Sequence, residues 1–309
     1  MNDPISALRR PRRLVPGDRV AVVAPSGPLQ PHRLARGSAV LESWGLDVVT
    51  GAHVLASTGF LAGRDEDRAA DVQRAWCDPD IAAVLCARGG SGAARLLDLL
   101  DWDEMLRAEP KPLVGYSDAT ALHEAVATHL GVATLFGPMP ATLTFGGDAP
   151  DEASIDHLRR TLFEPEQVQE LRGDGTTCVT AGRATGVTVG GTMALLAGSL
   201  GTSESRPANG GIAVLEDVTE PAYRLDNLLT QLLRTGWFEG LRGVVLGSWV
   251  DCGDGALETV CSRLEGLGVP VVAGLPFGHG VPQLTVPLGI EAELDATAGT
   301  LTMAEPALT

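Results

Sequence analysis

Short apolar segments alternate with amphipathic segments through about the first 140 residues, and this alternation constrains the fold more than any other feature. Apolar runs at residues 20–24, 81–87 and 112–115 are each followed by a turn rich in glycine or proline and then by a segment with helical spacing. A crossover from strand through helix to strand is right-handed and makes the strands parallel. We therefore predict a doubly wound α/β domain with a parallel sheet over residues 1–145.

The pattern changes after this first domain. Residues 146–184 are acidic and interrupted by proline and glycine, which predicts a linker with one short helix near residues 154–163. Further along, short strand-like segments surround two helix-like segments. We predict a second, smaller, mixed α/β domain over residues 185–309, in keeping with a length of 309 residues.

The chain is strongly acidic, with 23 Lys and Arg against 39 Asp and Glu and a formal net charge of −16. Such a surface repels phosphate backbones and anionic lipid, so we expect neither nucleic acid nor a membrane as a partner. Five cysteines without Cys-x-x-Cys spacing, no evident signal peptide and no run long enough to span a bilayer favour a cytoplasmic protein. Histidines and carboxylates are not clustered at ligand spacing, so we expect no metal and no cofactor.

The segment "KPLVGYSDATAL" places a serine on a turn between a predicted strand and a predicted helix. Gly115 and Ala119 stand two positions before and after Ser117, where a strained strand–turn–helix needs small residues. The helix that follows presents free N–H groups and the positive end of its dipole, which favour an oxyanion. The same residues are also typical of an ordinary helix N-terminus with Ser117 or Asp118 as N-cap. A nucleophile and a helix cap therefore both remain possible interpretations of Ser117.

A nucleophilic serine needs a base, and the base needs a carboxylate to orient it. Among six histidines, His279 lies between Gly278 and Gly280 after an apolar run, an arrangement that presents the ring to a cleft. Glu216 follows the apolar run "GIAVL" and precedes a helix, where a side chain is both supported and exposed. Ser117 belongs to the first predicted domain and the other two to the second, which predicts a site between the domains. A loop histidine without a role and a strand-terminal charge are the alternatives.

At these residues the chain resembles the LD-carboxypeptidases, or muramoyltetrapeptide carboxypeptidases, a family of serine peptidases. The matching stretches cover most of the chain in family order and include "VAVVAPSGP", "AAVLCARGGSGAARLLDLLD", "KPLVGYSDATAL", "LFGPM", "VLEDVTEPAYRLDNLLTQLL" and "GLPFGHGVPQLTVPLG". The resemblance implies that Ser117 is the nucleophile, Glu216 the carboxylate and His279 the base of a triad. It also implies a flavodoxin-like N-terminal domain and a smaller C-terminal domain.

Members of this family are commonly cytoplasmic homodimers that remove the terminal D-Ala from a murein tetrapeptide, and a related branch cleaves microcin C-type peptidyl or aminoacyl adenylates to give immunity. We therefore expect a homodimeric serine carboxypeptidase of peptidoglycan recycling, with the adenylate peptidase as the alternative. The chain departs from the family at Ser91, where a Tyr is usual, and at Thr192, where an Asn is frequent. Phe163 is the one aromatic residue between positions 146 and 189, which weakens the alternative because that branch stacks adenine on an aromatic side chain there.

The same assignment predicts an oxyanion hole formed by the backbone N–H groups of Asp118 and of the Gly89-Gly90 turn, where glycine lets the backbone approach the substrate closely. Arg88 borders this turn and is the candidate for binding the substrate carboxylate in so acidic a chain. A tight turn that opens a helix and a surface ion pair are the alternatives for these features. A peptide-binding sensor without activity is disfavoured, because a sensor has no reason to keep a complete nucleophile, base and acid.

Overall fold

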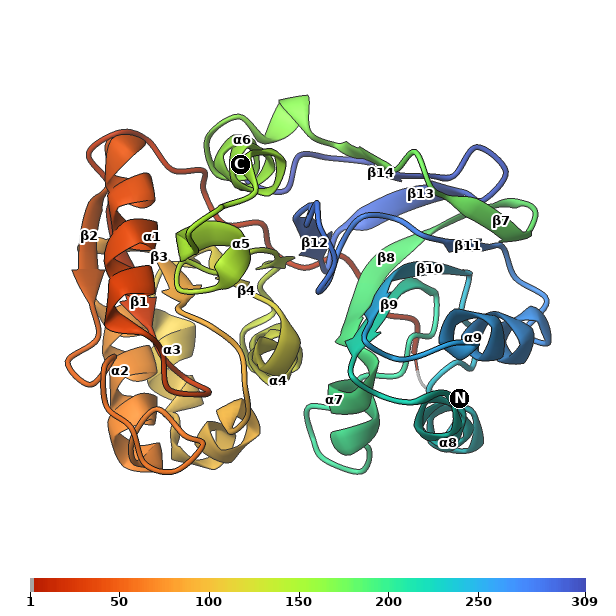
Figure 1. Cartoon of the computed structure of the whole chain (residues 1–309), viewed down its shortest axis with the longest axis horizontal. Helices are drawn as coiled ribbons and strands as arrows, with labels where there is room; N and C mark the ends of the chain where they lie inside the picture. Colours follow the sequence, from red (N-terminus) through yellow and green to blue (C-terminus); the bar gives the residue numbers. More distant parts are fainter. Residues whose placement is uncertain (1–2) are drawn as a thin grey trace.

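The computed structural model describes residues 3–309, which form two α/β halves, each with its own sheet (Figure 1). The N-terminal sheet has six strands in the order β12-β5-β4-β3-β1-β2. The strands β1 to β5 pair in parallel, whereas β12 is antiparallel to β5. These strands are β1 (Arg19–Val23), β2 (Asp47–Thr50), β3 (Ile81–Cys86), β4 (Leu113–Gly115), β5 (Thr134–Phe136) and β12 (Val286–Leu288).

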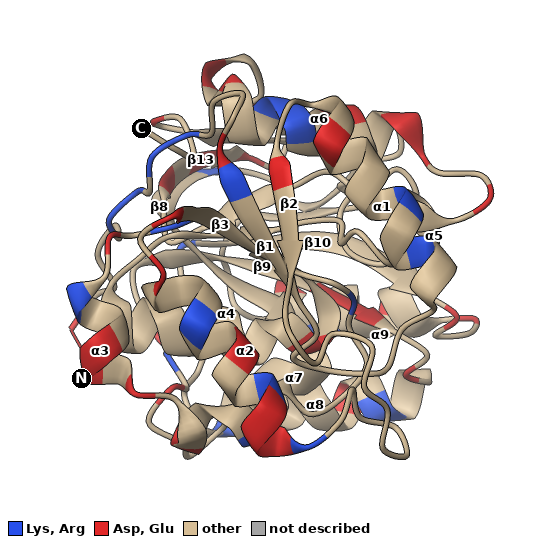
Figure 2. Ribbon diagram, turned by 90° about the vertical axis from the view of Figure 1, so that its left-hand side faces the viewer, with Lys and Arg blue, Asp and Glu red and all other residues tan. Residues whose placement is uncertain are grey.

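Helices cover both faces of this sheet. All six residues of β3 and all three of β4 are buried, because a parallel sheet covered on both faces leaves no side of a strand in water. Figure 2 shows α1, α5 and α6 on one side of strands β1 to β3, and α2, α3 and α4 on the other. The predicted doubly wound α/β architecture is confirmed, and the order β2-β1-β3-β4-β5 is the flavodoxin-like one. The helices are α1 (Pro31–Ser43), α2 (Asp65–Cys77), α3 (Trp102–Arg107), α4 (Thr120–Ala125), α5 (Leu143–Gly146) and α6 (Glu152–Phe163).

The C-terminal sheet has eight strands in the order β6-β14-β13-β8-β9-β10-β11-β7. Its centre, β8 to β11, is parallel, and antiparallel strands complete both edges, as a mixed α/β domain predicts. Its strands are β6 (Glu170–Arg172), β7 (Thr177–Thr180), β8 (Arg183–Thr192), β9 (Gly211–Val218), β10 (Gly243–Val250), β11 (Val271–Ala273), β13 (Glu291–Asp295) and β14 (Thr300–Met303). Its helices are α7 (Met193–Gly198), α8 (Ala222–Arg234) and α9 (Ala256–Glu265). Within residues 3–309, no helix combines the length and apolar character that crossing a bilayer requires.

Two segments connect the halves more closely than a simple linker does. In residues 146–184, α6 packs Leu158 and Leu162 into the N-terminal core, whereas β6 and β7 are edge strands of the C-terminal sheet. Conversely, β12 was expected with the second domain but pairs with β5, where it covers an otherwise open edge of the first sheet. The boundaries at residues 145 and 185 stay a prediction.

Candidate active site

Ser117 lies on the turn that follows β4, at the carboxyl edge of the parallel sheet. Its φ angle is 62°, in the left-handed region that costs a residue other than glycine about 1–3 kcal/mol. A Cβ at Gly115 would lie 2.8 Å from the Cβ of Ala119, so the small residues on both sides of Ser117 are required by this turn. The N-cap positions of the two short helices that follow are Tyr116 and Ala119. Helix capping is therefore not what holds Ser117 in this conformation.

The Gly89-Gly90 turn, which follows β3, approaches Ser117 closely. A Cβ at Gly89 would lie 2.8 Å from the Cβ of Ser117 and 3.0 Å from its Oγ, so no larger residue fits here without displacement. The buried side chain of Asp118 accepts a hydrogen bond of 2.8 Å from the N–H of Ala93 and so joins the two turns. The two turns predicted to form an oxyanion hole are neighbours in space.

His279 and Glu216 form a hydrogen-bonded pair in the C-terminal half. Nδ1 of His279 lies 2.7 Å from Oε2 of Glu216, and the backbone N–H of His279 donates to the same oxygen at 3.2 Å. The Glu216 side chain is fully buried, and its other oxygen accepts from the hydroxyl of Thr192 at 2.5 Å. Thr192 is the register partner of Glu216 in the pair β8–β9. The carboxylate is therefore fixed on both oxygens and orients the imidazole.

The two halves meet at a pocket of about 300 Å³. Ser117, Gly89 and Gly90 line it from the N-terminal half, and His279 lines it from the C-terminal half. The ring of Tyr116, the residue before Ser117, packs edge-to-face on the His279 ring with centroids 4.9 Å apart. The pocket thus brings together the serine and the histidine that sequence analysis selected, while Glu216 lies behind the histidine.

Two arginines line the same pocket. Arg88, the predicted carboxylate ligand, donates from Nε to the carbonyl of Gly89 at 3.1 Å and from Nη1 to the carbonyl of Pro28 at 2.8 Å. Its guanidinium therefore braces two loops as well as bordering the pocket. Arg33, in the first turn of α1, lines the pocket and forms no ion pair with a residue in the range 3–309. Arg33 is thus the cation better placed to meet an incoming anion.

Burial shifts the pKa of two side chains next to the pair. The pKa of Tyr116 is raised above its ordinary value, chiefly by burial and also by the charge of Glu216. Tyr116 therefore stays a neutral phenol beside His279. Burial also raises the pKa of Asp217 to about 7, although this carboxylate accepts hydrogen bonds of 2.8 Å from the N–H groups of Ala194 and Val218. Asp217 holds the start of α7 and does not face the pocket.

Sequence reasoning missed the contributions of Arg33 and Thr192. Arg33 follows the carboxyl end of β1, the same sheet edge that carries Ser117 and Gly89, and that shared edge is the signal that could have selected it. Thr192 stood out in the sequence only as a departure from a family motif. Its contact with Glu216 depends on the register between β8 and β9, which no local pattern gives. No group of three or more His, Cys, Asp or Glu arranged to hold a metal ion occurs within residues 3–309.

Comparison with known families identifies the family to which the chain belongs. The family model described as the LD-carboxypeptidase N-terminal domain matches residues 20–137, and that of the LD-carboxypeptidase C-terminal domain matches residues 185–294. The chain belongs to the LD-carboxypeptidase family. The predicted family and the predicted enzyme class, a serine carboxypeptidase, are confirmed.

Individual relatives agree with this assignment. A protein of Streptomyces coelicolor, whose carboxypeptidase name is itself provisional, is 55% identical over 97% of this chain and 98% of its own length. The murein tetrapeptide carboxypeptidase of Pseudomonas aeruginosa is 36% identical over 90% of this chain and 93% of its own. A structure of MccF in complex with glutamyl sulfamoyl guanosine superposes with a TM-score of 0.88 at 23% identity, covering 97% of this chain and 99% of that one. At that identity the likeness extends to the fold alone.

Proposed function

We propose that this LD-carboxypeptidase removes the terminal D-Ala from murein tetrapeptides in the cytoplasm, as a step of cell-wall recycling, and that it works as a homodimer. The observation that carries the proposal is a histidine hydrogen-bonded to a fully buried carboxylate, lining the same pocket as a serine in a strained turn. A relative named for the murein tetrapeptide reaction is 36% identical along nearly the whole chain, which supports this substrate class.

In this proposal Ser117 Oγ attacks the carbonyl carbon of the scissile bond. His279 takes the serine proton on Nε2 and later passes it to the nitrogen of the leaving D-Ala, while Glu216 fixes the Nδ1–H tautomer and stabilises the imidazolium. Ser117 and His279 have no direct hydrogen bond in this structure. Their hydrogen bond then forms as the substrate fills the pocket, since such contacts often tighten only in the complex.

The oxyanion of the tetrahedral intermediate is assigned to the N–H of Asp118 and to an N–H of the Gly89-Gly90 turn. One such donor typically contributes about 2.7–4 kcal/mol to lowering the barrier. The close approach of Gly89 to Ser117 Oγ supports this assignment. The free carboxylate of the substrate is assigned to Arg33, with Arg88 shaping the same wall of the pocket.

The alternative, cleavage of a peptidyl or aminoacyl adenylate, has less support in this chain. Phe163, the one aromatic candidate for stacking a base in residues 146–189, packs edge-to-face on Trp44 with ring centroids 6.3 Å apart. It is therefore engaged in the packing of α6 against the N-terminal half, and does not line the pocket.

A mass-spectrometric product assay tests the proposal. The purified protein is incubated with a murein tetrapeptide ending in D-Ala and, in parallel, with an aminoacyl sulfamoyl adenosine, and Ser117→Ala is the matched control. Release of D-Ala by the wild type but not by the variant is the expected result. Cleavage of the adenosine compound alone assigns the adenylate reaction instead. If neither compound is cleaved, or if Ser117→Ala is as active as the wild type, the proposal fails.

A further inference from the structure

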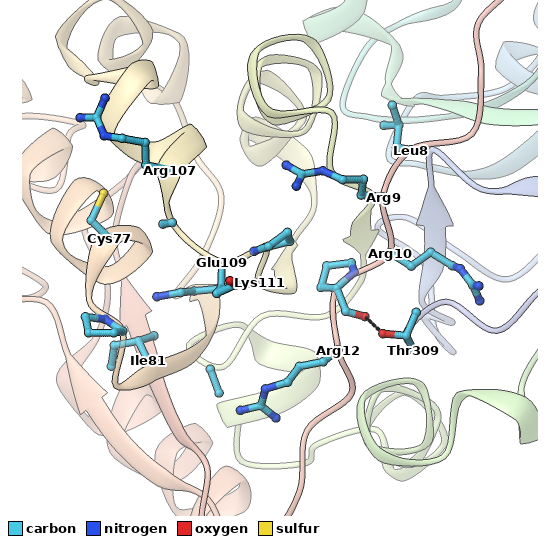
Figure 3. A pocket seen from close by; sticks show the side chains of 15 residues that line it. Leu8, Arg9, Arg10, Arg12, Cys77, Ile81, Arg107, Glu109, Lys111 and Thr309 are labelled. Carbon is cyan, nitrogen blue, oxygen red and sulfur yellow. Dashed lines mark hydrogen bonds between the residues drawn. The ribbon is translucent and has the colours of Figure 1, made fainter.

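A pocket of about 1030 Å³ at the amino ends of β3 and β4 contains several arginines, but it is not a built anion site. Arg107 points out of this pocket (Figure 3), and Arg12 forms an ion pair with Asp18. The ammonium group of buried Lys111 donates to backbone carbonyls at the end of α2. These cations therefore do not meet around a common point.

The segment that carries His279 crosses from one half of the molecule to the other. It begins after β11, a strand of the C-terminal sheet, and it ends at β12, which pairs with β5 in the N-terminal sheet. The N–H of Leu284 donates to the carbonyl of Pro276 at 2.8 Å, and this bond closes a loop around His279. We call residues 276–284 the His279 loop, and its neck consists of Pro276 and residues 283–285.

The tip of the His279 loop is fixed to the C-terminal half. The N–H of His279 donates to Glu216, and the N–H of Gly280 donates at 2.8 Å to the hydroxyl of Ser248 in β10. A Cβ at Gly280 would lie 2.9 Å from the Cβ of Ser248, so the tip lies directly against this strand. These contacts set the position of the imidazole relative to Glu216.

The neck of the loop is fixed to α6. The N–H of Gln283 donates to the hydroxyl of Ser154 at 2.6 Å, and the N–H of Thr285 donates to Nδ1 of His157 at 3.1 Å. Ser154 and His157 are three positions apart, so they lie on one face of the helix. Gln283 and Thr285 are buried, where a backbone N–H that loses its partner is costly.

The two acceptors on α6 are held ready for these bonds. The Ser154 hydroxyl donates at 2.5 Å to Oδ2 of Asp151, the N-cap of α6, and so presents a lone pair to the neck. Burial lowers the pKa of His157 to about 4, so its ring is neutral at pH 7 and Nδ1 can accept. Leu158 and Leu162 of the same helix are fully buried in the N-terminal core. The helix that holds the neck therefore belongs to the half that carries Ser117.

We propose that α6, which the sequence predicts as part of a linker, is a positioning element for the base. Through Ser154 and His157 it holds the neck of the His279 loop against the N-terminal half, and so sets the distance from Nε2 of His279 to Oγ of Ser117. A base must come within about 2.6–3.2 Å of the group whose proton it takes, and a misplacement of about 1 Å can lower a rate about 100-fold. Glu216 orients the imidazole, whereas α6 places it opposite the serine. This inference rests on the proposed triad.

The rate at which a fluorophosphonate labels Ser117 tests the proposal without a peptide substrate. In this reaction Ser117 Oγ attacks phosphorus, fluoride leaves, and His279 takes the serine proton. The rate therefore depends on the placement that α6 sets. Labelling is followed by mass spectrometry of the intact protein, with Ser117→Ala as the negative control, and kcat and KM for a murein tetrapeptide are measured in parallel.

Two variants each remove one acceptor from α6. His157→Phe keeps a ring but lacks Nδ1, and Ser154→Ala lacks the hydroxyl. We expect each variant to slow labelling and to lower kcat by about 10- to 100-fold, with little change in KM, because the variants displace the base and leave the substrate contacts in place. His157→Asn places an amide oxygen near the position of Nδ1 and is expected to restore most of the rate.

Thr161→Val is the matched control, because it removes another buried hydroxyl from the same helix. That hydroxyl donates to the carbonyl of His157 at 2.8 Å, within α6. This variant is expected to be labelled as fast as the wild type. Thermal unfolding of every variant checks that the fold is kept, and Ser154→Ala provides the test if His157→Phe does not fold.

The outcomes separate this proposal from the proposed reaction. If the wild type is not labelled, or if Ser117→Ala is labelled as fast, the triad itself is wrong. If the wild type is labelled, Ser117→Ala is not, and His157→Phe and Ser154→Ala react like the wild type, the triad stands and the role of α6 is overturned. Labelling of His157→Asn or Thr161→Val that is as slow as that of His157→Phe also overturns it, because loss of the acceptor is then not the cause.

Discussion

The two halves of the candidate active site are held in place by different means. The N-terminal half fixes Ser117 through the backbone: a positive φ angle, small residues on both sides and a glycine turn in close contact. The C-terminal half fixes His279 through side chains: a fully buried Glu216 that accepts from His279 on one oxygen and from Thr192 on the other. A strained and crowded backbone turn tolerates almost no increase in the size of its residues. A side-chain network depends instead on which hydrogen-bond donors are present.

A short chain of hydrogen bonds is among the contacts that join the two halves of the site. The N–H of Thr192 donates to the hydroxyl of Thr120 at 3.1 Å, and Thr120 is the first residue of α4, three positions after Ser117. The series of contacts Thr120–Thr192–Glu216–His279 therefore runs from the helix that follows Ser117 to the imidazole of His279. This connection predicts that the two halves act as one unit, despite their different construction.

The largest effect is expected from replacing Ser117, the proposed nucleophile. We predict that Ser117→Ala lowers kcat on a murein tetrapeptide by about 10⁶-fold and that adding His279→Gln lowers it little further, because members of a triad act together. Steady-state kinetics of both single variants and the double variant provide the measurement. Losses that multiply in the double variant would mean that the halves act independently.

A smaller effect on kcat is expected when a side chain is added to the glycine turn that contacts Ser117. Gly89→Ala places a Cβ 2.8 Å from the Cβ of Ser117, and we predict a loss of about 10²- to 10³-fold in kcat, the range for losing an oxyanion-hole donor. Gly175→Ala is the matched control, because a Cβ there meets nothing within 4 Å. Thermal unfolding of both variants checks that the fold is kept. Equal activity of Gly89→Ala and Gly175→Ala would show that the turn is not part of the reaction.

A change in the side-chain network around Glu216 is expected to lower kcat by a smaller factor. Thr192→Val keeps the shape but removes the hydroxyl that donates to Glu216, and we predict a loss of about 10- to 100-fold in kcat, the range for losing a partner that orients a functional side chain. Leaving a buried acceptor without this donor also lowers the free energy of unfolding by about 1–3 kcal/mol. Thr192→Ser retains the hydroxyl and should restore kcat. Failure of the serine to do so assigns Thr192 a packing role only.

The smallest expected effect is on the free energy of unfolding, and it concerns a residue at the contact between the halves. Buried Glu124 of α4 faces Arg206 of the C-terminal half, and burial raises its pKa from 4.5 to about 8. The folded protein thus keeps a proton that the unfolded chain has released, so the stability that the protonated group provides at low pH is lost as the pH rises through 8. We predict that the free energy of unfolding falls by about 1 kcal/mol between pH 7 and 9 because of this group.

Glu124→Gln cannot lose a proton and should abolish this part of the pH dependence. Urea unfolding of the wild type and the variant at pH 7 and pH 9 provides the comparison. The interval above pH 7 is chosen because burial lowers the pKa of His123 and His157 to about 4, so neither titrates there. Identical pH dependence in the two proteins would show that Glu124 is already ionised at pH 7.

The sequence by itself determined what depends on local pattern. The alternation of buried strands and helices gave the parallel N-terminal sheet, and the small residues around Ser117 indicated a strained turn. These features follow from side-chain period and steric size, which act between residues close in the chain. The selection of Ser117, Glu216 and His279 came from the same local reasoning together with the family resemblance, and their roles stay a proposal.

The tertiary structure decided what depends on residues far apart in the chain. The pairing of β12 with β5, the contact of Thr192 with Glu216 and the presence of Arg33 in one pocket with His279 join segments separated by tens to hundreds of residues. No local pattern encodes these contacts, because they arise only when strand register and domain packing bring the segments together.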